Sequence, residues 1–340
     1  MVAADGKLSF AELNERANRL AHALIARGAG PDDLVAVLLP RTADAVVAWL
    51  GVLKAGCAYL PVEPGWPADR VAAMLADARP AAMVTDADHA PPGDLPVLRV
   101  DQVQLPGHGL PAHDPTDADR VRPLLPSHLA FVIHTSGSTG LPKCVALTQR
   151  GVVNMYHGQN SGYMDEAVVA AGGRRLRVAL VSGFGFDAAW ADLLRMVAGH
   201  ELHLIDEELR KDAAALIDYS ARHRIDSLSV TPLFATQLLA AGLLTAPGHR
   251  PGLISLGGDL VDEGLWTELA ESGVPSYNFY GPTECTIDST FSLIAAGTRT
   301  HVGRPVANGR AHILDSTLRP VPPGAAASCT WPVRAWAAAT

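Results

Sequence analysis

A run of ten residues near the middle of the chain carries the groups that bind phosphate. From His134 to Lys143 it contains hydroxyl side chains, two glycines and a lysine. Glycines let the backbone approach an anion, N–H groups and hydroxyls donate hydrogen bonds to its oxygens, and a lysine offsets its charge. A surface loop can also be rich in Ser and Gly, but ten residues in this order favour a phosphate-binding loop.

This run is not a Walker A loop. That motif requires Gly-Lys-Ser/Thr in series, whereas Leu141 and Pro142 separate Gly140 from Lys143. A P-loop kinase is therefore excluded, and the sequence predicts a phosphate site of a different class.

The segments around the run alternate between apolar stretches and amphipathic ones. Residues 129–133 are apolar and predict a buried strand that leads directly into the run. A capping-box pair, Ser9 and Glu12, followed by helical spacing of apolar residues, predicts a first helix that ends near Gly28. This alternation is typical of mostly parallel sheets with helices on both faces. We expect further strands at 34–39, 81–85, 178–182, 200–205 and 228–231, and further helices at 42–55, 211–224 and 233–242.

Composition limits the classes of protein without choosing among enzymes. The 340 residues are 48% hydrophobic, enough for a large core and more than one subdomain. The net charge of −8 gives no basic face for nucleic acid. No apolar run approaches the roughly 20 residues of a membrane span, and the N-terminus lacks a signal pattern. The four cysteines are far apart and show no metal spacing, so we expect a reduced, cytoplasmic protein. Residues 90–126, rich in Pro, Asp and Gly, are expected to form a loop.

Five segments of the chain carry motifs that occur together in one enzyme superfamily. They are Leu8–Leu13, Leu53–Pro64, His134–Lys143, Asn278–Glu284 and Gly303–Pro305. In this order they resemble the core motifs of the adenylate-forming enzymes, and within them those of the adenylation domains of nonribosomal peptide synthetases. A chance match to one short motif is plausible, but a chance match to five in order is not.

The resemblance implies an architecture and a reaction. The expected fold is α/β, the large N-terminal part of the adenylate-forming fold. It would have two doubly wound, mostly parallel sheet subdomains, with the β-barrel and small C-terminal subdomains incomplete or absent. The implied reaction joins an amino-acid carboxylate to ATP, giving an aminoacyl-AMP and pyrophosphate for nonribosomal peptide biosynthesis. The implied cofactors are ATP, Mg²⁺ and the phosphopantetheine of a partner carrier domain, and the implied partners are the peptidyl carrier protein and condensation domains of a synthetase.

The resemblance also assigns roles at the nucleotide. Lys143 and Thr283 are implied to act on the phosphates, and Glu284 to hold Mg²⁺, a hard cation suited to oxygen ligands. Tyr280 is implied to stack on adenine opposite Gly257 and Gly258. The other implied nucleotide-binding residues are Thr135, Ser136, Gly137, Ser138, Thr139, Gly140, Asp259, Asn278 and Gly281. Cys144 stands where the family usually has glycine.

A second set of residues is implied to bind the amino acid. Asp187 matches the aspartate that pairs with the substrate α-ammonium, a charge-assisted bond that selects an amino acid over a simple acid. Asp288 is a second carboxylate, expected at the side-chain end of the pocket. Because a buried carboxylate needs a cationic partner, we predict a basic substrate: arginine, ornithine or a cyclic guanidino relative. The remaining implied pocket residues are Ala188, Ala191, Ser229, Ser255, Gly257, Phe279 and Ile287.

Both ends look incomplete beside the family. Residues 1–324 match the N-terminal region of an adenylation domain, whereas residues 325–340 form a non-homologous tail. Read in another frame, the tail can encode the family's own Gly-Glu-Leu-Tyr continuation, so our hypothesis is a frameshift near Gly324. The chain has no counterpart to the family's ribose-binding aspartate or C-terminal lysine. The resemblance therefore predicts weak or absent activity for this chain alone.

Two alternatives remain open at this stage. An acyl- or aryl-CoA ligase of the same superfamily would need no aspartate for an ammonium group, so Asp187 argues against it. A non-catalytic nucleotide-binding remnant would bind ATP without pyrophosphate exchange. Neither the exact amino acid nor the peptide product follows from the sequence.

Overall fold

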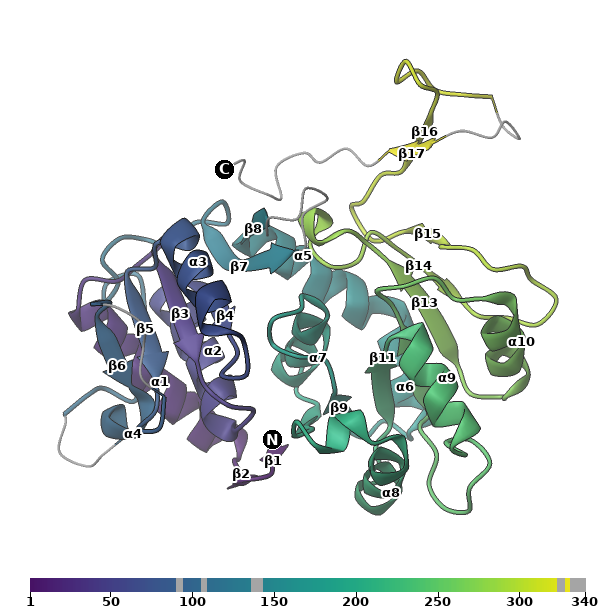
Figure 1. The fold of residues 1–340 in the computed structure, drawn as a ribbon, viewed down its shortest axis with the longest axis horizontal. Helices are drawn as coiled ribbons and strands as arrows, with labels where there is room; N and C mark the ends of the chain where they lie inside the picture. The colour runs from purple at the N-terminus through teal and green to yellow at the C-terminus, as the bar shows by residue number, and fades with distance from the viewer. Residues whose placement is uncertain (90–93, 105–108, 136–142, 323–327, 331–340) are drawn as a thin grey trace.

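The chain folds into two α/β lobes that lie side by side (Figure 1). The computed structural model describes all residues except 90–93, 105–108, 136–142, 323–327 and 331–340. Strand–helix alternation produces mostly parallel sheets in both lobes, as the sequence predicts. No helix among the described residues is both long and apolar enough to cross a bilayer.

The first lobe contains a six-stranded sheet with strand order β6-β5-β3-β4-β7-β8. All neighbouring pairs are parallel except the antiparallel hairpin β7–β8. The strands are β3 (Leu34–Leu38), β4 (Ala58–Val62), β5 (Ala82–Thr85), β6 (Val97–Arg99), β7 (Leu129–Thr135) and β8 (Lys143–Thr148). The helices are α1 (Phe10–Ala26), α2 (Ala43–Ala55), α3 (Ala68–Ala78) and α4 (Val100–Val103).

The second lobe contains a nine-stranded sheet with strand order β15-β14-β13-β12-β11-β9-β10-β1-β2. Its strands are β1 (Val2–Ala3), β2 (Gly6–Lys7), β9 (Arg177–Leu180), β10 (Glu201–Leu204), β11 (Ser227–Val230), β12 (Leu253–Leu256), β13 (Ser276–Tyr280), β14 (Thr290–Leu293) and β15 (Arg304–Pro305). Its helices are α5 (Gln149–Gln159), η1 (Asn160–Met164), α6 (Asp165–Ala170), α7 (Ala188–Val197), η2 (Leu209–Lys211), α8 (Ala213–His223), α9 (Pro232–Ala240), α10 (Glu263–Glu271) and η3 (Thr283–Cys285). A separate hairpin, β16 (His312–Leu314) with β17 (Ser328–Thr330), projects away from the lobes (Figure 1).

Local signals explain several element ends. The predicted capping box forms: the Ser9 hydroxyl accepts from the Glu12 N–H, and the Glu12 carboxylate accepts from the Ser9 N–H. Gly56 closes α2 in the left-handed conformation with φ of 90°. The prediction of a loop over residues 90–126 is wrong in part. Strand β6 and helix α4 lie inside it, because β6 completes the edge of the sheet by pairing with β5.

Aromatic packing and one arginine join the two lobes. Trp190 of α7 stacks on Phe131 of β7 with ring centroids 4.0 Å apart and meets Trp49 of α2 edge-on at 5.3 Å. Arg41 donates three hydrogen bonds of 2.7–2.8 Å across the boundary. The acceptors are the carbonyl oxygens of Leu180, Ser182 and Ile205. The carboxyl ends of β9 and β10 are therefore fixed against the first lobe.

Candidate active site

A cavity of about 440 Å³ opens at the carboxyl ends of the strands in the second lobe. Its walls come from the ends of β9, β11, β12 and β13 and from the first turns of α7. This edge is where open parallel sheets place their ligands. The size suits a small molecule. All nine residues predicted to contact the amino acid line this one cavity: Asp187, Ala188, Ala191, Ser229, Ser255, Gly257, Phe279, Ile287 and Asp288.

Asp187 lies at the N-terminus of α7, between the residues predicted to bind the amino acid and those predicted to bind the nucleotide. It is the residue that precedes the first turn of the helix, and its side chain is half-buried. Burial raises the pKa of Asp187, a hydrogen bond with the Thr283 side chain opposes that rise, and the charge of Glu284 adds to it. A residue predicted to bind the substrate ammonium therefore contacts a residue predicted to bind the α-phosphate.

Asp288 is a carboxylate without a close cation. Its Oδ2 accepts a hydrogen bond of 2.9 Å from Gln159 Nε2, at the end of α5. Desolvation raises the pKa of Asp288 to about 6, and the repulsion from Asp187 acts in the same direction. No ion pair to Asp288 is found among the described residues. Its charge is compensated by an amide and by the more distant Arg195.

A strained turn aims Asp288 into the cavity. Thr286 and Ile287 have φ of 63° and 72°, and the left-handed region is unfavourable for β-branched residues. Gly281 fixes this turn, because a Cβ at that position would lie 2.0 Å from the carbonyl oxygen of Ile287. Holding such a backbone costs about 1–3 kcal/mol per residue, so the surrounding structure must enforce it.

A buried ion pair lies beside the same cavity, which Arg195 lines. Arg195 Nη1 is 2.6 Å from Asp192 Oδ1 and donates to Ser229 Oγ at 2.7 Å. Arg195 Nη2 donates to the Tyr163 hydroxyl at 3.2 Å. Asp192 and Arg195 are 0% and 1% exposed, and desolvation raises the pKa of Asp192 to about 6. Because Asp192 neutralises Arg195, the positive charge at the cavity base is already matched.

Three of the residues predicted to bind the nucleotide line the cavity, and others lie on elements near it in the chain. Gly257, Gly258 and Gly281 line it, and Tyr280 follows Phe279 at the end of β13 with a half-exposed ring. Thr135 and Lys143 are cross-strand partners at the open end of hairpin β7–β8. Strand β8 also packs against η3, which carries Thr283 and Glu284. The predicted residues Ser136, Gly137, Ser138, Thr139 and Gly140 lie outside the described residues.

Two predicted nucleotide residues have their side chains engaged elsewhere. The Asn278 amide is buried and donates to the His301 carbonyl at 3.0 Å. The Asp259 carboxylate accepts from the Leu260 N–H at 2.7 Å. Neither residue lines the cavity, so their roles at the nucleotide stay predictions.

The oxygen groups beside Asp187 fit Mg²⁺. Glu284 is exposed, its charge acts on Asp187, and the Thr283 side chain forms a hydrogen bond with Asp187. Carboxylate and hydroxyl oxygens are the ligands this hard cation prefers. Glu284 would hold the ion, which supplies positive charge at the phosphates.

Gln159, Asp192 and Arg195 were not expected from the sequence, although two of them line the cavity. The Asp192–Arg195 pair had a signal, because opposite charges three residues apart in an apolar helix face one another. Gln159 had none. It reaches Asp288 across 129 positions of chain, a placement that only the tertiary fold decides.

Known proteins are similar to this chain in sequence and in fold. The AMP-binding enzyme family matches residues 1–327, and the chain belongs to that family. The family assignment agrees with the motifs at Lys143 and Glu284 and with the two-lobed architecture.

Within the family, the similar proteins are nonribosomal peptide synthetases. CymA of Salinispora arenicola, a synthetase by its description, is 40% identical over 323 residues, which are 93% of this chain and 4% of CymA. The dimodular nonribosomal peptide synthase of Bacillus subtilis is 36% identical, over 94% of this chain and 13% of that protein. The chain therefore spans a small part of the length of these relatives.

Solved structures give the same result. The synthetase FmoA3 bound to α-methyl-L-serine-AMP has a TM-score of 0.84 and 26% identity, over 99% of this chain and 38% of that one. The four-domain synthetase AB3403, bound to AMP and glycine, has a TM-score of 0.81 and 26% identity, over 95% of this chain and 23% of that one. The fold is that of the large N-terminal part of an adenylation domain.

Proposed function

We propose that this chain activates an amino acid by forming an aminoacyl-AMP with release of pyrophosphate. The proposal is supported by Asp187, which lines the cavity, and by the Thr283 side chain, whose hydrogen bond opposes the rise in the pKa of Asp187. The amino-acid carboxylate must meet the α-phosphate in this reaction. The residue predicted to hold the α-ammonium, next to that carboxylate, interacts with the residue predicted to bind the α-phosphate. The relatives named above support the same reaction class.

The proposed step balances without a further reactant. A carboxylate oxygen of the amino acid attacks the α-phosphorus of ATP, and the bond from that phosphorus to the bridging oxygen breaks, so pyrophosphate leaves with the electron pair. Asp187 accepts hydrogen bonds from the substrate ammonium and orients the carboxylate. Lys143 and Thr283 stabilise the phosphate oxygens. Positioning and electrostatics supply most of such catalysis.

The preferred amino acid is a basic one. Asp187 accounts for the α-ammonium, and Asp192 already neutralises Arg195. Asp288 is then the carboxylate left for a charge on the substrate side chain. The Oε1 atom of Gln159 is buried and has no hydrogen-bond partner among the described residues, so it can accept from the same group. A guanidinium has donors enough for both oxygens.

The aminoacyl group would next pass to a carrier. The likeness to multidomain synthetases supports transfer to the phosphopantetheine thiol of a peptidyl carrier protein, with condensation domains acting later. This partner assignment rests on the relatives alone.

Two substrates differing only at the α-amine test the reaction class. With arginine, the chain should bind a non-hydrolysable arginyl-adenylate analogue, and the same chain completed by the family's C-terminal subdomain should catalyse exchange of pyrophosphate into ATP. The des-amino analogue of arginine should fail in both assays. Equal use of the des-amino acid would favour an acid-activating ligase instead, and binding of ATP without any amino-acid dependence would favour a non-catalytic nucleotide binder.

A further inference from the structure

Three metal-ligating side chains meet beside the open end of hairpin β7–β8. They are Asp77 from the last turn of α3, His134 of β7 and Cys144 of β8. One ligand atom of each lies within 4.8 Å of the other two. His134 and Cys144 are direct cross-strand partners, and His134 Nε2 is 3.2 Å from Asp77 Oδ2. Residues from three elements therefore converge on one point.

The histidine at the centre of this cluster is not fully satisfied by the protein. The His134 side chain is 2% exposed, whereas that of Asp77 is 60% exposed. The Nδ1 atom of His134 is buried and has no hydrogen-bond partner among the described residues. The Nε2 atom, which faces Asp77, is the nitrogen available to a metal at this point, whereas Nδ1 lies on the other side of the ring.

We propose that Asp77, His134 and Cys144 bind Zn²⁺ through three protein ligands, with a fourth position open to water. Thiolate, imidazole and carboxylate are the ligands zinc takes in proteins. Zinc bonds of about 2.0–2.3 Å put neighbouring ligand atoms roughly 3.3–3.8 Å apart in a tetrahedron. The observed spacing needs only a small contraction.

The binding step releases one proton. Zinc replaces the hydrogen of the Cys144 thiol, that proton passes to the solvent, and no oxidation or reduction takes place. The site is separate from the magnesium proposed at Glu284, because Mg²⁺ takes oxygen ligands and avoids sulfur.

The position of the cluster would let bound zinc influence nucleotide binding. His134 directly precedes Thr135, and Cys144 directly follows Lys143. A metal held by both would fix the distance between the two strand ends and would tie them to α3. Zinc occupancy should therefore alter the affinity for nucleotide phosphates without contacting the amino-acid cavity.

Cobalt titration of the purified chain tests the proposal directly, because thiolate-bound Co²⁺ absorbs in the near ultraviolet. The chain should bind one equivalent with a thiolate charge-transfer band, and Zn²⁺ should abolish the band by displacement. Cys144→Ser should remove the band, whereas the matched control Cys285→Ser, another partly exposed thiol, should retain it. Asp77→Asn, at an exposed position that folding tolerates, should weaken zinc binding by roughly 100-fold.

Three results would overturn the proposal. They are the absence of a band in the unsubstituted chain, a band that persists in Cys144→Ser, and unchanged zinc affinity in Asp77→Asn. Circular dichroism of each variant separates a lost site from a lost fold. If Cys144→Ser does not fold, the Asp77→Asn result decides alone.

Discussion

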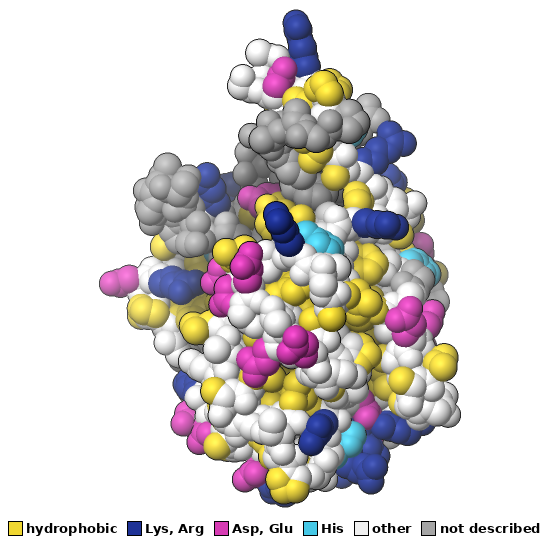
Figure 2. Space-filling view, turned by 90° about the vertical axis from the view of Figure 1, so that its right-hand side faces the viewer, with side chains coloured by type: hydrophobic (Ala, Val, Ile, Leu, Met, Phe, Trp, Pro, Cys, Tyr) yellow, Lys and Arg dark blue, Asp and Glu magenta, His cyan; other side chains and the backbone are white. Residues whose placement is uncertain are grey.

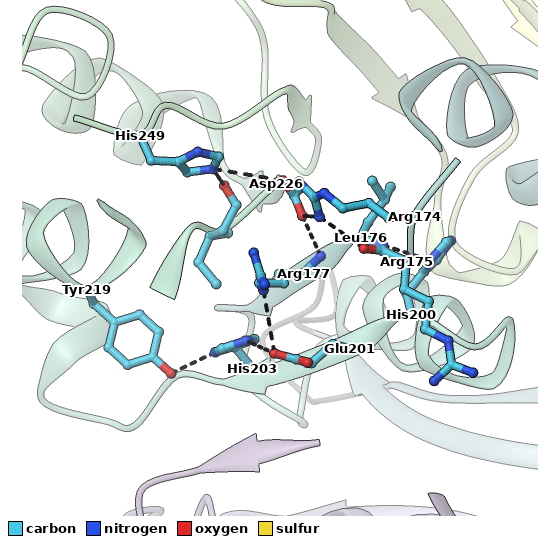
Figure 3. A network of polar contacts seen from close by, with 11 residues as sticks. Arg174, Arg175, Leu176, Arg177, His200, Glu201, His203, Tyr219, Asp226 and His249 are labelled. Carbon is cyan, nitrogen blue, oxygen red and sulfur yellow. Dashed lines mark hydrogen bonds and ion pairs between the residues drawn. The ribbon is translucent and has the colours of Figure 1, made fainter. Parts of the chain in front are cut away.

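Carboxylates at the two edges of the nine-stranded sheet have pKa values shifted in opposite directions. At the amino edge, Asp226 accepts two hydrogen bonds of 2.6 and 2.7 Å from Arg174 and one of 2.8 Å from the Arg177 N–H, with His249 3.8 Å away (Figure 3). Although burial alone would raise it, these contacts hold the pKa of Asp226 below its ordinary value. At the carboxyl edge, Asp187 and Asp288 have raised pKa values.

The difference indicates that the amino edge serves the stability of the fold and the carboxyl edge serves ligand binding. The amino edge continues as a closed polar network in which Glu201 contacts His203, and His203 contacts the Tyr219 hydroxyl (Figure 3). Charges there are matched by the protein and stabilise the fold. The carboxyl edge keeps two carboxylates whose compensation is incomplete, and carrying them costs stability. A ligand with two positive charges would complete that edge.

One face of the molecule illustrates how charge is distributed on the described surface. On the face turned toward the viewer in Figure 2, acidic and basic side chains are interspersed among apolar and neutral ones. The carboxylates of Asp187 and Asp288 differ from these surface charges because they line a cavity.

The largest expected effect is at the mouth of the cavity. Asp187→Asn removes the negative charge that pairs with the substrate ammonium, so affinity for an arginyl-adenylate analogue should fall by about 100-fold, or about 3 kcal/mol. Isothermal titration measures it. The matched control is Asp226→Asn at the other edge, which should bind as the unsubstituted chain does. A similar loss in both variants would erase the difference between the edges.

Asp226→Asn should act on stability instead. It leaves Arg174 without its partner, and because Arg174 is 42% exposed, the cost should be modest, about 2 kcal/mol in the free energy of unfolding. The lowered pKa of Asp226 means that its contribution is present above about pH 4 and is lost as pH falls further. Urea denaturation at pH 7.5 measures the change, and an unaltered midpoint would contradict it.

Asp288→Asn should change the free energy of unfolding in the opposite direction from Asp226→Asn. The folded-state pKa of about 6 lies above the ordinary value, so the stability associated with Asp288 is present below about pH 4 and is lost as pH rises through 6. Since Asp288 faces the cavity and retains some solvent, we expect the variant to gain about 1–2 kcal/mol at pH 7.5 and nothing at pH 4. Denaturation at both values is the measurement. A variant that is less stable at pH 7.5 would show that Asp288 is paired like Asp226.

Gln159→Leu should have the smallest effect on substrate affinity of these variants. The substitution removes one hydrogen bond to Asp288 and one acceptor for the substrate, so affinity for the arginyl analogue should fall by about 5-fold, or about 1 kcal/mol. Binding of a norleucyl analogue should not fall. Equal losses for the two analogues would mean that Gln159 supports the cavity shape and not its charge.

Some parts of the molecule are predictable from the sequence, and others depend on tertiary contacts. The Ser9–Glu12 box was predictable because its signal is local, and the cavity residues from Asp187 to Asp288 were identified through motifs. The carboxyl edge was foreseen in its residues but not in its charge pairing, since Gln159 and Arg195 reach Asp288 only through the tertiary fold. Strand β6 was missed because a short edge strand in a Pro-rich segment carries almost no periodic signal.

The central claim is that Asp288 is left unpaired for the side chain of a basic substrate. The most direct measurement compares the affinities of arginyl- and norleucyl-adenylate analogues for the unsubstituted chain and for Asp288→Asn. We expect the chain to prefer the arginyl analogue by about 30-fold, near 2 kcal/mol, and we expect Asp288→Asn to remove this preference. Equal affinities in the unsubstituted chain, or a preference that survives the substitution, would contradict it.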